Sequence, residues 1–491
     1  MTLFYWWDEM KLLREEKDYL DKKGILSWLD KYETDDKYIP RFKKLERYSS
    51  GDNPTIMDKD KKEVNNPDNR VPISYGRKLI TTFKGYGYRP GYITYEVDED
   101  KDKSYLETMT EIFEMNHEHL KTSTGGENTG IYGQSYELLY INEESEIRFV
   151  PIPPQEMILL YDYEAEPNIK IAIRSVKIND NKYTIYVYYP DKIEEWEKTR
   201  KGAGTEGYEW ELTKKGNGYD NPFTEIPIVP YYLDNNREGI IWPVHYLIDM
   251  LDALISGNMD EFERFANSYL RLVGMSLDSP SRLKSENAIR GILRRIKKLR
   301  AFEQLQHPDD VTFLTKDLPT EFLKMMYDIL IEQIHKQSHV TDMDQRELSG
   351  VAVQRMMYDF ENVISTAEAE FDKGLYRRME LINVILKVKG IEIQEPSVIK
   401  ISHKRNAPLN LKEFAESART MKEAGLSMHA ILRNMPDDMI PDIDNELAYQ
   451  EEERNALMPD LYGEGNEIRS TGGGQTSEAG KEIPEGNPSS T

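Results

Sequence analysis

Apolar residues in the second half of the chain recur every three to four positions, a pattern that predicts long helices. It runs without a break from Ile240 to Tyr269, and the opposite face of this predicted helix is acidic. A helix of about 28 residues rises on the order of 40 Å. Further helices are predicted over residues 321–339 and from Gly350 onward. The acidic residues of the first helix are Asp249, Asp252, Asp260, Glu261 and Glu263.

The first half of the chain mixes this helical period with the alternation that is typical of strands. Helices are predicted over residues 8–47, 71–84 and 104–122, and a strand over residues 91–97. Alternating Tyr, Ile, Val and Thr then predict strands at 135–141, 147–152, 156–161, 169–178 and 183–189, two more around a turn at 201–208, and one ending at Val229. This order indicates an α+β unit over roughly residues 1–235.

Two shorter regions complete the predicted organisation. Residues 270–316 show the pattern strand, helix, strand, and form a compact insert between two long helices. Residues 391–402 contain a predicted strand, and 409–449 contain further helices. From Gly463 onward the chain is dominated by Gly, Ser, Glu, Thr and Pro, so residues 463–491 are predicted to be a disordered tail.

Composition narrows the class of protein. The 491 residues include no cysteine, which excludes disulfides and cysteine-based zinc sites and suits a reducing cytoplasm. No apolar run is long enough for a membrane helix, and no basic segment precedes the apolar N-terminus, so neither a membrane span nor a signal peptide is expected. The formal net charge of −24 argues against tight DNA binding but allows a surface along which DNA slides.

Motifs of enzymes and cofactor sites are weak in this chain. Gly202–Gly207 matches GxGxxG, but strand-like residues follow it, so a hairpin turn is the better interpretation. His117 and His119 are two residues apart on a predicted helix and point in different directions. There is no P-loop, HExxH or GxSxG motif. No catalytic residue, metal site or cofactor is therefore predicted, although a triad remote in sequence is not excluded.

A basic island stands out in this acidic chain. Residues 281–300 carry eight Lys or Arg and one acid, Glu286. One interpretation is a solvated helix face with local salt bridges. The other is a docking surface for an acidic partner, a neighbouring subunit, or nucleic acid at a channel mouth. The residues predicted to make these contacts are Arg290, Arg294, Arg295, Lys297 and Lys298.

The loop between the last two long helices has few apolar anchors. It runs from Thr341 to Leu348 and is followed by Gly350, a residue that permits backbone angles other residues resist. Such a loop is expected to belong to the less stable, mobile part of a structure. Asp344, Gln345 and Arg346 are its candidate contact residues.

The order of these elements and several local patterns resemble the portal (head-to-tail connector) proteins of long-tailed bacteriophages, over about residues 45–450. Tyr48–Asp52 is similar to a YYxGxH-type element, and Gly85–Tyr95 to GYxxGKPIxY, with an extra residue and Arg for Lys. The segment from Ile131 to Glu156 is the closest match. Ser349–Ala352 corresponds to SGVAL, with Val353 in place of Leu.

The resemblance implies a portal fold that assembles as a ring. The implied parts are an α/β wing, a two-helix stem, a small α/β clip, a tunnel loop and a helical crown. Their boundaries would be 1–240 and 351–408 for the wing, 241–270 and 319–340 for the stem, 271–318 for the clip, 341–350 for the tunnel loop and 409–462 for the crown. The acidic face of helix 241–270 and the basic island are candidate subunit interfaces.

The resemblance also implies a function without catalysis. Twelve copies would form a ring at one capsid vertex of the virion, assembled in the host bacterial cytoplasm, with double-stranded DNA passing through during packaging and ejection. The partners would be a terminase motor, a head-tail adaptor, and capsid and scaffolding proteins. The alternatives are another ring-forming virion connector or, with less support, a nuclease that uses acid-bound Mg²⁺.

Overall fold

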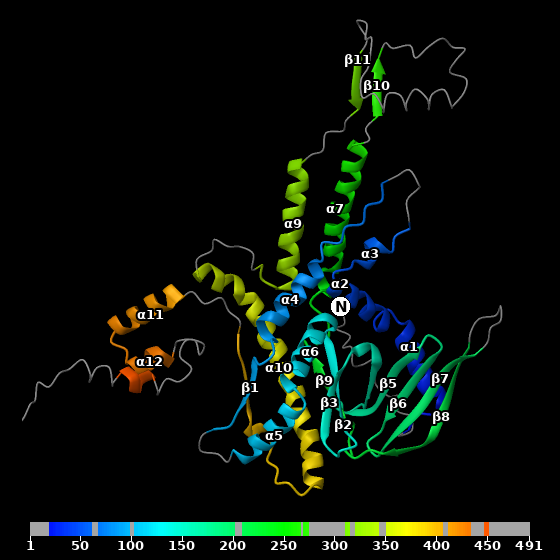
Figure 1. Cartoon of the computed structure of the whole chain (residues 1–491), viewed down its shortest axis with the longest axis vertical. Coiled ribbons are helices and arrows are strands. Elements are labelled where there is room, and N and C mark those ends of the chain that lie inside the picture. The colour runs from blue at the N-terminus through cyan, green and yellow to red at the C-terminus, as the bar shows by residue number, and fades with distance from the viewer. Residues whose placement is uncertain are drawn as a thin grey trace, which may run out of the picture. The chain divides into compact units, whose positions relative to one another are not determined.

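The computed structural model describes residues 19–60, 67–98, 103–201, 209–266, 269–273, 310–314, 320–342, 350–405, 411–433 and 446–450. The chain divides into two compact units, residues 1–408 and 409–491. The first unit holds the helices and sheets of Figure 1 up to β12. In the second unit, α11 (Leu411–Glu423) and α12 (Met428–Arg433) are joined by a turn at Gly425, whose φ is +85°.

Helices open the first unit, and their ends follow local capping chemistry. In α1 (Lys22–Thr34) the Asp21 carboxylate accepts from the Gly24 N–H at 2.7 Å, which satisfies one of the free donors at the helix start. Next, α2 (Ile39–Ser50) begins with a proline in its first turn and ends at Gly51 in the left-handed conformation. Two more helices follow, α3 (Pro54–Met57) and α4 (Tyr75–Gly87).

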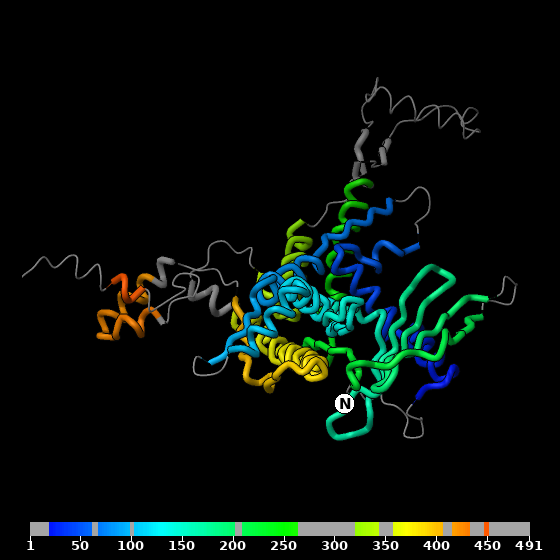
Figure 2. The backbone as a smooth tube through the Cα atoms, turned by 60° about the horizontal axis from the view of Figure 1, so that its bottom comes forward, coloured from blue at the N-terminus to red at the C-terminus, as the bar shows by residue number. Residues whose placement is uncertain are grey.

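Two antiparallel sheets form the β part of this unit. One has the order β3-β2-β9, with β2 (Gln134–Ile141) between β3 (Ile147–Ile152) and β9 (Ile228–Tyr232). The other is a meander in chain order, which Figure 2 shows as a curved layer. Its strands are β4 (Met157–Tyr161), β5 (Ile169–Asn179), β6 (Lys182–Tyr188), β7 (Lys192–Lys201) and β8 (Glu209–Asp220).

Two helices cover the smaller sheet. The helices α6 (Glu118–Tyr132) and α10 (Gly350–Val388) pack against it, and α5 (Ser104–Met115) packs on α6. Glycine lets α4 approach α6 closely, since a Cβ at Gly130 would lie 2.6 Å from the Phe83 ring. The strands β1 (Ile93–Glu96) and β12 (Lys400–His403) pair antiparallel although about three hundred residues separate them.

The remaining elements of the first unit form a helix pair and a two-stranded sheet. The helix pair consists of α7 (His245–Ala266) and α9 (Thr320–Ser338), which pack against each other. In Figure 1 both rise from the same side of the sheets. Between them in sequence lie β10 (Tyr269–Val273) and β11 (Asp310–Leu314), which pair antiparallel. Short 3-10 turns occur at Pro154–Glu156, Trp242–Val244 and Pro396–Val398.

The mixed helix and sheet content agrees with the predicted α+β class, but several boundaries differ. The helix predicted over 104–122 is broken, because the Asn116 side chain donates to the Ile112 and Ile147 carbonyls and accepts from the Phe149 N–H. Its second part, α6, continues to Tyr132, ten residues past the predicted end at 122. The first long helix starts at His245 rather than Ile240, after the 3-10 turn at residues 242–244.

The centre of the first unit contains a buried ion cluster. Arg378 of α10, 1% exposed, donates to both carboxylate oxygens of Glu137 at 2.7 and 2.9 Å and to Glu118 at 3.0 Å. Tyr95 also donates to Glu118, at 2.7 Å. Burial by itself lowers the pKa of Arg378, but Glu137, Tyr231 and the other groups around it raise that pKa well above its usual value. Arg378 therefore keeps its positive charge inside the core.

Removing this charge is expected to destabilise the fold strongly. Arg378→Met leaves Glu137 and Glu118 buried without their cation, at a cost of about 3–5 kcal/mol in the free energy of unfolding. Arg377→Met is the matched control, because Arg377 pairs with Glu225 and Glu380 nearer the surface, where such pairs contribute about 0–1 kcal/mol. Chemical denaturation followed by circular dichroism measures both. Equal losses for the two variants would contradict this role of Arg378.

Candidate functional site at the helix pair

The structure describes only some of the residues that were predicted to make contacts. Asp344, Gln345 and Arg346 lie outside the described residues, and so do Arg290, Arg294, Arg295, Lys297 and Lys298. Gly350 is the first residue of α10. The described chain on the other side of the loop reaches Asp342. The site that the structure does describe is therefore the helix pair, the end of α9 and the segments that hold them.

A row of polar side chains on α7 binds an extended segment of the same chain. The N–H groups of Asn69, Val71 and Ile73 donate to the side chains of Asp260, Ser256 and Asp252, at 2.7, 3.0 and 2.9 Å. The order of the partners reverses, so residues 69–73 run antiparallel to α7. We call this arrangement the ladder.

The ladder can form because four residues of helix and two residues of extended chain have nearly the same length. Four residues of helix rise about 6 Å, and two residues of extended chain span about 6.6 Å. Side chains four residues apart on α7 therefore meet every second N–H of the extended segment. These N–H groups have no strand partner in the described residues, and the side chains supply the acceptors that a sheet neighbour would.

The ladder corrects one expectation from the sequence. The acidic face of the first long helix was a candidate subunit interface, yet Asp249, Asp252 and Asp260 are 9%, 1% and 5% exposed. Tyr48 donates to Asp249, and Asn53 donates to Asp252 at 2.8 Å. The row is acidic because it accepts hydrogen bonds from the body of its own subunit.

Burial shifts pKa values in and around this row. It raises the pKa of Asp252 above the usual value, and the hydrogen bonds from Asn53 and Ile73 only partly oppose it. Burial, followed by the hydrogen bond to Asp249, also raises the pKa of Tyr48. Keeping Asp252 ionised therefore costs free energy, which the hydrogen bonds from Asn53 and Ile73 partly offset.

Both helices of the pair expose large apolar side chains. On α9, Phe322, Met325 and Ile329 are spaced at i, i+3 and i+7, and are 53%, 49% and 41% exposed. On α7, Tyr246 and Met250 are exposed one turn apart, and Met259 and Phe262 are exposed nearer its end. Within this single chain no described residue covers either face. Large apolar stripes of this kind usually mark an interaction surface.

The end of α9 is fixed by a small polar network. Lys78 of α4 pairs with Asp342 at 3.0 Å. His335 donates from Nδ1 to the Val340 carbonyl at 2.7 Å, so in the neutral ring Nε2 accepts from the Tyr75 hydroxyl at 2.9 Å. Val340 itself is buried. We call this group, from Tyr75 and Lys78 to Asp342, the loop base.

The loop base borders a cavity. The cavity has a volume of about 670 Å³ and lies between α4, the last turns of α9 and α10, with Asp359 on its far wall. His339, with φ of +57°, is in the left-handed conformation and turns the chain from α9 toward Val340. Sequence reasoning missed Tyr75, Lys78 and His335, since nothing local links α4 to a loop more than 260 residues away.

Two kinds of site are absent from the described part of the chain. No group of three or more His, Cys, Asp or Glu side chains there could hold a metal ion. Among the same residues, no helix combines the length and apolar character that crossing a membrane requires.

Breaking the ladder is expected to destabilise the attachment of α7. Asp252→Ala leaves the Ile73 N–H and the Asn53 amide without their acceptor, at a cost of about 1–3 kcal/mol in the free energy of unfolding. Glu332→Ala is the control, because this exposed acid of α9 forms only a surface pair with Lys336 among described groups and should change stability by less than about 1 kcal/mol. Thermal unfolding compares them, and equal shifts would refute the ladder's contribution.

Solved structures similar to the chain include the neck of an empty GTA particle computed with C6 symmetry (10% identity, 82% of this chain and 95% of the other, TM-score 0.46). They also include the neck of a native GTA particle computed with C12 symmetry (9% identity, 74% and 89%, TM-score 0.43) and the virion of a native gene transfer agent particle (10%, 85% and 99%, TM-score 0.43).

One protein family matches most of the chain. No curated protein sequence matches the chain. The family described as "Phage portal protein, SPP1 Gp6-like", however, matches residues 30–459, which include every described element from α2 to α12. The chain therefore belongs to this family of phage portal proteins.

Proposed function

We propose that twelve copies of this chain close into a ring at one capsid vertex and that DNA is packaged and ejected through the ring. Membership of the portal family supports a structural, connector role. The observation that carries the ring is the pair of outward apolar faces on α7 and α9. A ring closed by head-to-tail contacts needs two different complementary surfaces on each subunit, and these two faces are the candidates for them.

The parts of this ring are assigned as the sequence predicted them. The helix pair is the stem, the sheets with their covering helices are the wing, and β10 and β11 belong to the clip. The second unit contributes the crown, and the loop after Asp342 is the tunnel loop. The proposed bounds are 1–240 and 351–408 for the wing, 241–270 and 319–340 for the stem, 271–318 for the clip, 341–350 for the tunnel loop and 409–462 for the crown.

The chemistry of a DNA channel suits this chain. With a net charge of −24, the subunit repels phosphate on average, so a duplex inside the ring would slide rather than bind. Asp344, Gln345 and Arg346 would contact the duplex, and Gly350 would be the hinge. The loop base supports this assignment, because the Lys78–Asp342 pair fixes one end of the loop to α4 and α10 begins at the other.

Partner proteins would dock on the same ring as a virion component. The clip residues Arg290, Arg294, Arg295, Lys297 and Lys298 would contact a neighbouring subunit or the acidic surfaces of a terminase motor and a head-tail adaptor. Capsid and scaffolding proteins would contact the wing. In this division of labour the motor hydrolyses ATP, which agrees with the missing P-loop in this chain.

A charge placed in the apolar face of α9 should prevent ring closure. Met325→Glu buries a carboxylate in the proposed interface, where an unpaired charge is strongly unfavourable. Gln337→Glu is the control, since it adds the same charge at an exposed position of the same helix. Native mass spectrometry and electron microscopy should show closed rings for the wild type and the control, and single subunits for Met325→Glu. Rings of wild-type size in Met325→Glu would refute this interface.

The tunnel loop is tested separately from assembly. Gly350→Val should stiffen the hinge, and deletion of residues 343–347 should remove the contact residues. Both are expected to leave the ring intact and to lower DNA packaging severalfold. Ala369→Val is the matched control, because it places the same side chain on an exposed face of α10 away from the loop. Wild-type packaging in both loop variants would show that the loop is only a connector.

A further inference from the structure

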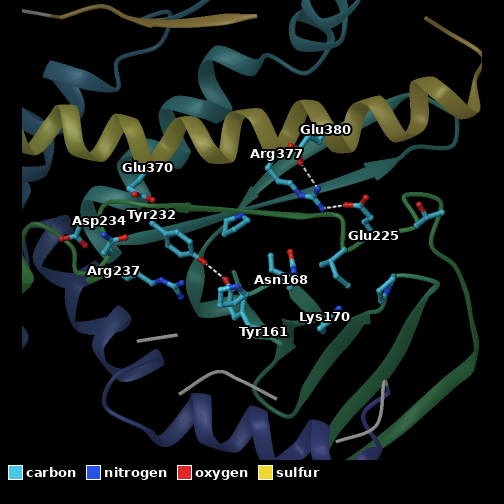
Figure 3. Close-up of a pocket in the computed structure, with 17 residues that line it drawn as sticks. Tyr161, Asn168, Lys170, Glu225, Tyr232, Asp234, Arg237, Glu370, Arg377 and Glu380 are labelled. Atoms are coloured by element: carbon cyan, nitrogen blue, oxygen red, sulfur yellow. Dashed lines mark hydrogen bonds and ion pairs between the residues drawn. The ribbon is translucent and has the colours of Figure 1, made fainter. Parts of the chain in front are cut away.

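A second cavity lies away from the helix pair. It has a volume of about 840 Å³ and lies between the β4–β5 hairpin, the segment after β9, and α10 (Figure 3). Apolar and aromatic side chains make up much of its wall, which is typical of ligand and peptide sites of this size. These side chains are Tyr161, Pro167, Ile169, Pro190, Ile226, Pro230 and Tyr232.

One cation in this cavity has no carboxylate partner among the described residues. The Arg237 guanidinium lies over the Tyr232 ring at 4.0 Å, and the hydroxyls of Tyr161 and Tyr232 bond to each other at 2.6 Å. Arg377, on the α10 side, is by contrast paired with Glu225 and Glu380. Figure 3 shows these two arginines on different walls of the cavity. An acceptor group that enters from solvent can therefore bind Arg237.

The backbone at Arg237 is tightly constrained. It is in the left-handed conformation, with φ of +54°, and it lies against Gly133, where a Cβ would come within 2.3 Å of the Arg237 carbonyl carbon. A non-glycine residue held at such angles costs about 1–3 kcal/mol, so the surrounding structure must enforce it. Strain of this kind at a charged cavity residue is consistent with a binding role.

The chain itself enters the described structure beside this cavity. Tyr19 donates to Asp191 at 2.6 Å, and the Leu20 N–H donates to the Tyr189 hydroxyl at 3.1 Å. Pro190, the residue between these two partners, lines the cavity. The point from which residues 1–18 extend is thus fixed at the cavity's edge.

The aromatic residues near the start of the sequence match the apolar part of the cavity wall. Phe4, Tyr5, Trp6 and Trp7 are followed at once by Asp8 and Glu9. Twelve peptide steps separate Trp7 from Tyr19, a reach of at most about 40 Å. A tether this short gives an effective concentration on the order of millimolar, which favours a segment of the same chain over one in solution.

We propose that this cavity is the docking site of residues 1–18 of the same chain. The aromatic side chains at positions 4–7 fill the wall of Tyr and Pro, and Asp8 or Glu9 pairs with Arg237. Docking covers apolar residues that would otherwise meet water and joins the N-terminal arm to β9 and α10.

The absence of native cysteine makes a direct test possible. Met10→Cys is combined with Asn235→Cys at the cavity rim, and a short bis-maleimide is added to the full-length protein. The expected product is one chain with an internal cross-link and altered mobility in a denaturing gel. Met10→Cys with Asn181→Cys is the control, since Asn181 is exposed in the β5–β6 turn at the far end of the sheet. It should give at least severalfold less product.

Two further variants test the chemistry of docking. Arg237→Gln and the double change Trp6→Ser with Trp7→Ser should each lower the yield of the 10–235 cross-link severalfold. The arm variant removes no described contact, so it separates docking from folding. Equal yields at Asn235 and Asn181, unchanged yields in both variants, or products that join only different chains would each overturn the proposal. The readout is scored on denatured single chains, so failure of ring assembly does not affect it.

Discussion

The first unit depends on one buried cation that serves two buried acids. Arg378 joins α10 to β2 through Glu137 and to α6 through Glu118, and Tyr95 ties the β1–β12 pair to the same carboxylate. An isolated charge in such a place would be very costly, so each member requires the others. The helix that follows the predicted tunnel loop is in this way fixed to the sheet.

The same principle, a buried group that needs a distant partner, governs the attachment of the helix pair. The polar row of α7 looks in sequence like a solvated face, and its apolar row looks like a core face. In the structure both rows are mixed: Asp252 of the polar row is buried, whereas Met259 and Phe262 of the apolar row are exposed. Backbone N–H groups of residues 69–73 are what make burial of the acids tolerable.

Local pattern predicted most of the elements, because helix and strand periods are properties of neighbouring residues. The strands from β2 to β9 and the start of α10 at Gly350 lie close to where alternation and the glycine indicated them. Features that depend on residues distant in the sequence were not predicted. Asn116 ends a helix through contacts with β3, and Lys78 meets Asp342 only in the folded chain. The family followed from the order of motifs, whereas the predicted loop and clip residues lie outside the described structure.

The ladder has a mechanical meaning that follows from its direction. Its three hydrogen bonds run across α7 and are spaced along the helix axis. A force along that axis loads all three in shear at the same time, and they must break together. A force at right angles to the axis would open them one after another, like a zipper. The ladder therefore holds α7 most firmly against forces directed along the helix axis.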